Sequence, residues 1–106
     1  MKCDIPEKIT RDLIEIFQKL TGGGPTIPID VLKQRLKIEE HPRVRLMIKK
    51  PEAIATEFEF SALFVSGDKG YLEQEDFLEL HRNIYWVTPR EGISNFQNMI
   101  KLLWNA

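Results

Sequence analysis

The chain has 106 residues, 42% hydrophobic and 29% charged, with a formal net charge of −1 at pH 7. These totals are typical of one soluble globular domain, and a core of this size needs no metal or disulfide. They exclude a membrane span of ~20 apolar residues and a secretory signal, and a single cysteine, Cys3, fits a reducing cytosol.

The first predicted unit covers residues from about 6 to 38. Apolar residues at helical spacing predict its first helix: Ile9, Leu13, Ile16, Phe17 and Leu20. This helix ends at the segment 21–25, where three glycines and a proline interrupt it. Ile27 is then extended, and a second helix begins between Pro28 and Asp30, with Leu36 facing inward.

Residues 39–50 are predicted to link two such units. His41-Pro42 ends or kinks the second helix, because a residue before proline favours extended geometry. A short linking helix is indicated by three apolar residues: Val44, Met47 and Ile48.

The second predicted unit covers about 51–86 and repeats the first. A helix over 52–64 precedes a loop with Gly70 and Leu72, and another helix runs from about 74 to 85. Leu72 corresponds to Ile27. In paired motifs of this kind the two residues lie in a short antiparallel ladder that joins the loops.

A further helix is predicted over about 89–104, with Thr88 to Glu91 as a capping box. Its first apolar stripe is Ile93, Phe96, Ile100 and Leu103, and its second is Met99, Leu102 and Trp104. A helix that is apolar on two sides should be covered on both, by the rest of the domain or partly by another molecule.

Charge is divided along the chain. Residues 33–50 carry seven basic and two acidic residues, a net +5, and residues 51–79 carry one basic and eight acidic, a net −7. The basic patch is Arg43, Arg45, Lys49 and Lys50. It lacks the interleaved aromatics of a nucleic-acid surface, so nucleic acid is not the expected partner. An acidic protein surface fits it, and so does a simple solvated face.

The second loop has the outline of a calcium-binding helix–loop–helix motif, D-x-[DN]-x-[DN]-G-x5-E. With Gly70 at position six, the ligand positions one, three, five and twelve are Val65, Gly67, Lys69 and Asp76. Only Asp76 is a carboxylate, and Asp68 stands at a non-ligand position. We therefore expect no metal site, and Asp68 and Asp76 are the weak candidates.

Other chemistry is not indicated. The GGGP segment lacks the Gly-Lys-Ser/Thr ending of a phosphate loop. His41 and His81 are far apart and have no ligand partner at metal spacing, so His81 is predicted to be a packing residue. Without a catalytic set, the chain is not expected to be an enzyme.

The chain resembles the C-terminal pair of EF-hands in calcyphosine-like proteins. The segments that carry the resemblance are IFQKL (16–20), Ile27 to Leu32, His41-Pro42-x-Val44, FSALF (60–64), KGYLEQEDF (69–77), Tyr85-x-Val87-Thr88 and Phe96-x-x-Met99…Trp104. The resemblance implies an all-α EF-hand pair that senses calcium and docks on protein partners, in cytoplasmic, cytoskeletal or ciliary and flagellar settings. The missing ligands argue against the calcium role.

The function we predict is a calcium-independent protein-interaction module. Two such hands form an apolar cup in which an amphipathic helix or the chain's own tail can settle. Eight candidate contact residues follow: Phe17, Leu36, Met47, Phe58, Phe77, Met99, Leu103 and Trp104. The alternatives are a calcium sensor or buffer, and a basic-face adaptor for acidic cytoskeletal tails. No membrane partner and no cofactor are expected.

Overall fold

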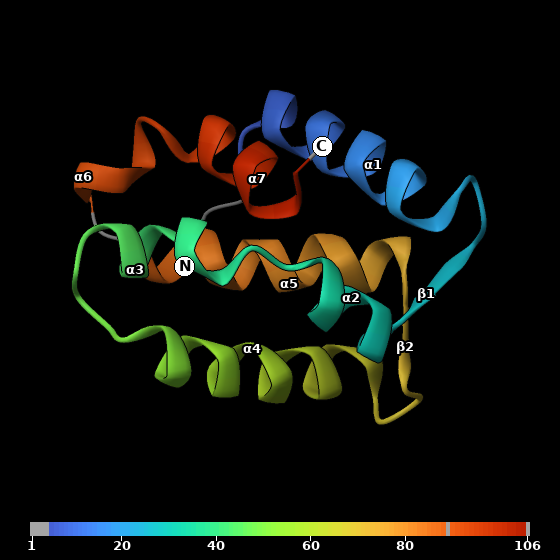
Figure 1. Cartoon of the computed structure of the whole chain (residues 1–106). Coiled ribbons are helices and arrows are strands. Elements are labelled where there is room, and N and C mark those ends of the chain that lie inside the picture. Colours follow the sequence, from blue (N-terminus) through green and yellow to red (C-terminus); the bar gives the residue numbers. More distant parts are fainter. Residues whose placement is uncertain (1–4, 89, 106) are drawn as a thin grey trace.

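The structure is a computed structural model that describes residues 5–88 and 90–105, without the side chain of Glu91. It is mostly helical, with one small two-stranded sheet (Figure 1). The elements are α1 (Glu7–Thr21), β1 (Thr26–Pro28), α2 (Ile29–Arg35), the 3-10 helix η1 (Ile38–Glu40), α3 (Pro42–Arg45), α4 (Pro51–Ser66), β2 (Tyr71–Glu73), α5 (Gln74–Val87), α6 (Arg90–Ile93) and α7 (Phe96–Trp104).

The two strands pair antiparallel, with Ile27 opposite Leu72. The predicted ladder between the two loops is thus confirmed. Both side chains are buried, so the ladder is also a point where the two halves of the core meet. Pro28 has no N–H to donate, and the next residue compensates because the Ile29 N–H donates to the Gly70 carbonyl at 3.0 Å.

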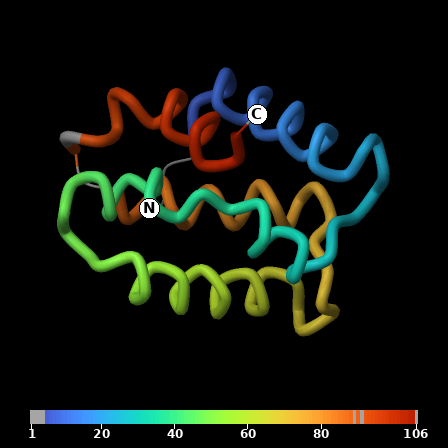
Figure 2. Tube along the Cα trace, viewed as in Figure 1, coloured from blue at the N-terminus to red at the C-terminus, as the bar shows by residue number. Residues whose placement is uncertain are grey.

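The helices are arranged around α5 (Figures 1 and 2). Helix α4 packs on one side of α5, and α1 packs on another side together with α7. The short helices α2 and η1 contact α4. None of the helices in the described part of the chain is both long and apolar enough to cross a bilayer.

Left-handed glycines end the first helix of each half. Gly22 follows α1 with φ 65°, and Gly67 follows α4 with φ 62°. A residue with a Cβ is disfavoured in this conformation, so glycine terminates both helices at the predicted loops.

The second helix is shorter than its pattern predicts. Helix α2 ends at Arg35, well before Pro42, and the chain continues into η1. The prediction that His41-Pro42 ends this helix was therefore wrong. His41 is extended as expected, and its Nδ1 accepts the Arg43 N–H at 3.2 Å, so that it caps α3 instead.

The linking helix also differs from the prediction. Helix α3 covers only Pro42–Arg45, so Met47 and Ile48 lie outside it. Met47 has φ 59°, a conformation that interrupts a right-handed helix. Its side chain is 90% exposed.

The predicted helix over 89–104 is divided into α6 and α7 by the turn at Ser94 and Asn95, residue types that favour turns over helix interiors. The Thr88 hydroxyl donates to the Ile84 carbonyl at 2.6 Å, so it helps to close α5. Pro89 and the Glu91 side chain, which the predicted capping box includes, lie outside the described residues.

Candidate functional site

The second loop contains a cation of its own. The Lys69 Nζ lies 3.0 Å from Glu73 Oε1 and 3.4 Å from Asp76 Oδ2. The hydrogen bond to Glu73 is the main reason that the pKa of Lys69 is raised above its ordinary value. The residue at the predicted ligand position five therefore donates to the carboxylate at the predicted position twelve.

Asp76 has a second structural role at the start of α5. Its Oδ2 accepts the Glu73 N–H at 3.0 Å, and the Glu73 side chain accepts a backbone N–H in return, which makes a capping box. The carboxylate at position twelve is thus held by a backbone amide and by Lys69.

The rest of this loop offers few oxygen ligands. Val65 and Gly67, at positions one and three, have no side-chain oxygen, and Asp68 is exposed with φ 63°. Within the described residues no group of three or more His, Cys, Asp or Glu side chains could hold a metal ion. The first loop contributes two glycines with positive φ, Gly22 and Gly23, and its residues 22–28 include no carboxylate.

The cup between the halves is filled by the chain's own α7. The Trp104 ring lies 5.6 Å from Phe77 and 6.0 Å from Phe58, centroid to centroid. The Lys37 N–H also donates to the Leu103 carbonyl at 2.8 Å, which joins α7 to the segment after α2. The predicted occupants of the cup were an amphipathic helix or the chain's own tail. In the structure the cup holds the tail, as helix α7.

A buried histidine fixes the position of Trp104. The Trp104 indole N–H donates to His81 Nε2 at 2.8 Å, while His81 Nδ1 lies 2.8 Å from the Phe77 carbonyl. His81 therefore carries its proton on Nδ1 and is neutral. Burial lowers its pKa to about 4. The prediction of a packing histidine is confirmed.

The predicted contact residues are distributed unevenly over the structure. Six of them are buried: Phe17, Phe58, Phe77, Met99, Leu103 and Trp104. In this conformation the six form the core and are not accessible to a partner, because α7 occupies the cup. Leu36 is half-buried and Met47 is exposed, so these two remain accessible.

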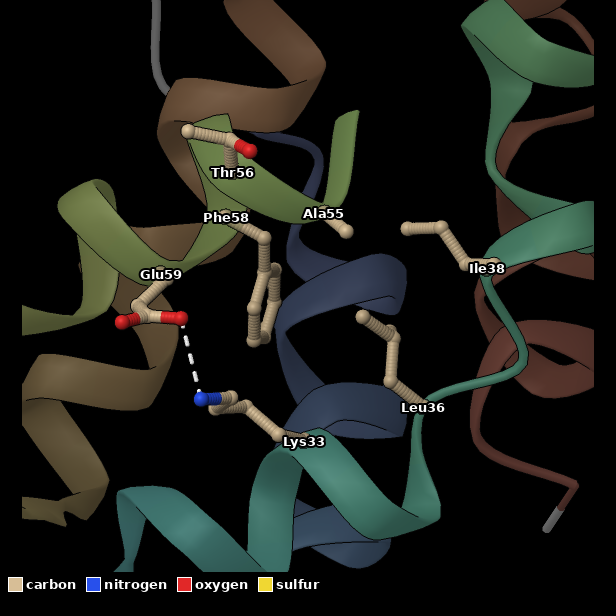
Figure 3. Close-up of a pocket in the computed structure, with 7 residues that line it drawn as sticks. All are labelled: Lys33, Leu36, Ile38, Ala55, Thr56, Phe58 and Glu59. Atoms are coloured by element: carbon tan, nitrogen blue, oxygen red, sulfur yellow. Dashed lines mark ion pairs between the residues drawn. The ribbon is translucent and has the colours of Figure 1, made fainter. Parts of the chain in front are cut away.

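Leu36 lines a groove of about 270 Å³ between α2, η1 and α4 (Figure 3). Leu36 and Ile38 point across it toward Phe58 and Ala55. At its edge Lys33 Nζ lies 2.9 Å from Glu59 Oε2. The groove thus has an apolar floor and a charged rim.

The outer side of α4 is a surface that the sequence reasoning missed. Phe60 is 69% exposed and Phe64 is 84% exposed, and both belong to the apolar residues of the predicted helix over 52–64. A cavity of about 320 Å³, lined in part by Phe60 and Leu63, lies beside them. The available signal was that α4 is apolar on several sides, which one buried face cannot cover.

The basic patch is largely paired within the chain. Arg43 lies 2.7 Å and Lys49 3.1 Å from the Glu57 carboxylate, and Arg45 pairs with Glu40. Lys50 is exposed at the start of α4. Arg43 and Lys49 thus share one carboxylate, and three of the four cations already have an acidic partner.

No model of a known protein family and no curated protein matches the chain. The function is therefore argued from the second loop, the filled cup and the surface of α4.

Proposed function

We propose that the chain is a calcium-independent protein-interaction module built on a degenerate EF-hand pair. Two observations support the scaffold: each half runs helix, glycine loop, short strand and helix, and the two strands pair at Ile27 and Leu72. The resemblance predicts a cytoplasmic and cytoskeletal or ciliary setting for such a module.

The observation that carries the proposal is the position of Lys69. Its ammonium group contacts Asp76, the carboxylate at the last ligand position, and Glu73, which caps the same helix. A Ca²⁺ ion at the same place would meet the positive charge of Lys69 and would find no side-chain oxygen at positions one and three. The internal ammonium thus supplies the positive charge that a metal ion would bring.

A binding role is supported by the apolar surface that the fold leaves outside. Phe60 and Phe64 are exposed close together on one helix, and the groove at Leu36 lies on the same helix's flank. Contiguous exposed apolar surface in a soluble domain is typical of an interaction site. The basic patch is less favoured as that site because most of its charges are paired.

Titration calorimetry with Ca²⁺, together with thermal melting, tests the proposal. We expect no binding heat and no rise in melting temperature for the natural chain stripped with a chelator. The positive control is the variant Val65→Asp, Gly67→Asn and Lys69→Asp, which restores oxygen ligands at positions one, three and five. A micromolar isotherm for the natural chain would instead favour a calcium sensor or buffer.

A further inference from the structure

We propose that the hydrogen bond between Trp104 and His81 is an acid-sensitive latch: protonation of His81 releases α7 from the cup while the two halves stay folded. We call the Trp104 indole, the His81 ring and the Phe77 carbonyl the tail latch. The inference goes beyond the proposed function, because it concerns how the cup opens and not which partner the module binds.

The tail latch closes only when His81 is neutral. Its Nδ1 proton is directed at the Phe77 carbonyl, so Nε2 is left to accept the Trp104 indole N–H at 2.8 Å. A second proton has to go on Nε2, where it faces another donor, because an indole nitrogen donates and does not accept. Protonation therefore replaces the hydrogen bond by two opposed N–H groups, and both side chains are almost fully buried.

A positive charge on His81 has no compensating partner in the closed cup. Among the described residues the titratable group that acts on His81 from another element is His41, which follows η1, and its charge opposes that of His81. On α5 itself, Glu79 and Arg82 pair with each other at 3.0 Å. A buried charge without a partner is costly, so protonation of His81 favours an open cup.

The second buried histidine responds to acid in the same direction. The Nδ1 of His41 accepts the Arg43 N–H, and a proton on Nδ1 removes that acceptor. The charge of Arg43 opposes protonation of His41, and Glu57, which favours it, is already paired with Arg43. Helix α7 contacts η1, beside this histidine, so protonation of His41 weakens the cap of α3 next to the site where α7 docks.

Helix α7 can leave the cup without unwinding the rest of the fold. The exposed turn at Ser94 and Asn95 separates it from α6. The two halves are joined by the ladder and by the packing of Phe17 on Phe77, with 5.4 Å between ring centroids, and neither contact is made by titratable side chains. Release of α7 therefore uncovers the apolar floor of the cup and leaves the junction of the halves in place.

The test is amide hydrogen exchange of the full chain by NMR between about pH 7 and about pH 4, corrected for the intrinsic effect of pH on exchange. The Lys37 N–H donates to the Leu103 carbonyl and reports the docking of α7. The Ile29 N–H donates to the Gly70 carbonyl and reports the junction of the loops.

We expect acid to lower the protection of the Lys37 N–H on the order of a hundredfold. The pKa of His81 is about 4 in the closed cup against an ordinary 6.5, so the open form takes up the proton first and is favoured as the pH falls below about 6.5. The Ile29 N–H should stay at least about tenfold better protected than the Lys37 N–H at the lowest pH, because it is lost only on global unfolding.

The variant His81→Gln keeps an acceptor for the Trp104 N–H and does not titrate, so the fall in protection at Lys37 should be at least about tenfold smaller. The matched control is Asp12→Asn, because Asp12 of α1 is the carboxylate that lies 3.8 Å from Lys101 of α7. This variant should retain the full fall.

The imidazole nitrogen signals of the natural chain provide a second measurement that needs no variant. His81 should take up its second proton over the same pH range in which the Lys37 N–H loses protection. Equal protection of the Lys37 and Ile29 amides at every pH would show that acid unfolds the whole chain at once and would overturn the proposal. An undiminished fall at Lys37 in His81→Gln, or no fall at Lys37 in the natural chain, would overturn it too.

Discussion

The second helix of the first half, α2, has seven residues, whereas its counterpart in the second half, α5, has fourteen. Both halves otherwise share a plan: a helix ended by a left-handed glycine, a loop, and a three-residue strand. The short α2 leaves space beside the core, and η1 and α7 occupy it. The tail of the chain thus completes the shorter half.

The loops differ in chemistry as much as the helices differ in length. The second loop has the Lys69 ion pairs and the Glu73–Asp76 capping box, and the first loop has glycines and Pro25 instead. Both loops nevertheless place a buried residue, Ile27 or Leu72, in the ladder. What the halves must share is the apolar contact at their junction, and the polar groups of a loop can vary around it.

The largest expected effect comes from removing the side chain by which α7 completes the shorter half. Trp104→Ala should lower the free energy of unfolding by about 3–5 kcal/mol, because it leaves a cavity beside Phe58 and Phe77. Urea denaturation measures this loss in the free energy of unfolding. Leu102→Ala, on the same helix at a 51% exposed position, is the control and should cost about 0.5 kcal/mol or less. Equal costs would mean that α7 is only a peripheral addition.

The equivalence of the halves can be tested at the ladder. Ile27→Ala and Leu72→Ala should each cost about 2–4 kcal/mol, because both side chains are almost fully buried. The double variant should cost less than the sum, since the two residues are paired neighbours. A double-mutant cycle in urea measures this coupling. Strict additivity would contradict a shared junction.

Acid should destabilise the fold through two buried histidines. The pKa of His81 and that of His41 are lowered from an ordinary 6.5 to about 4, chiefly by burial. The unfolded chain therefore takes up protons first, and stability falls as the pH drops from about 6.5 to 4, by roughly 2–3 kcal/mol for each histidine.

Urea denaturation across this pH range measures the loss. His81→Gln keeps a polar partner for Trp104 but does not titrate, so its stability should depend less steeply on pH than that of the natural chain. Identical slopes would show that His81 is not the group responsible.

The smallest effect is expected at the Lys69 pairs, which mark the difference between the loops. Lys69→Gln should leave the melting temperature nearly unchanged, because the ammonium is exposed and its pairs are screened by water and salt. Glu15→Gln, which removes the exposed partner of Lys19, is a matched control. A large loss for Lys69→Gln alone would give the ammonium a structural role equal to that of a bound ion.

Much of the fold follows from local patterns. The spacing of apolar residues predicts α1, α4 and α5 to within a few residues, and the glycines predict where the first helix of each half ends. The correspondence of Ile27 with Leu72 predicts their pairing because the two halves repeat one plan. The weak candidates for metal ligands, Asp68 and Asp76, lie in the second loop, and Asp76 caps helix α5.

The surface could not be predicted in the same way. An apolar residue in a helix, such as Phe60, has the same local signature whether it faces the core or water. Phe17, Phe58 and Trp104 were predicted as contact residues, but they are buried because α7 folds back into the cup. Residue type and spacing do not specify which of several apolar faces a distant helix will cover.

The sequence by itself determined the helical plan, the glycine stops and the shortage of side-chain oxygens in the second loop, since each depends on residue identity at short separation. Only the tertiary structure decided that the tail fills the cup and that Phe60 and Phe64 face outward. These features depend on contacts between segments far apart in the chain or on which face of a helix the core covers. The free energy of such packing is set by the whole assembly of elements, not by any one of them.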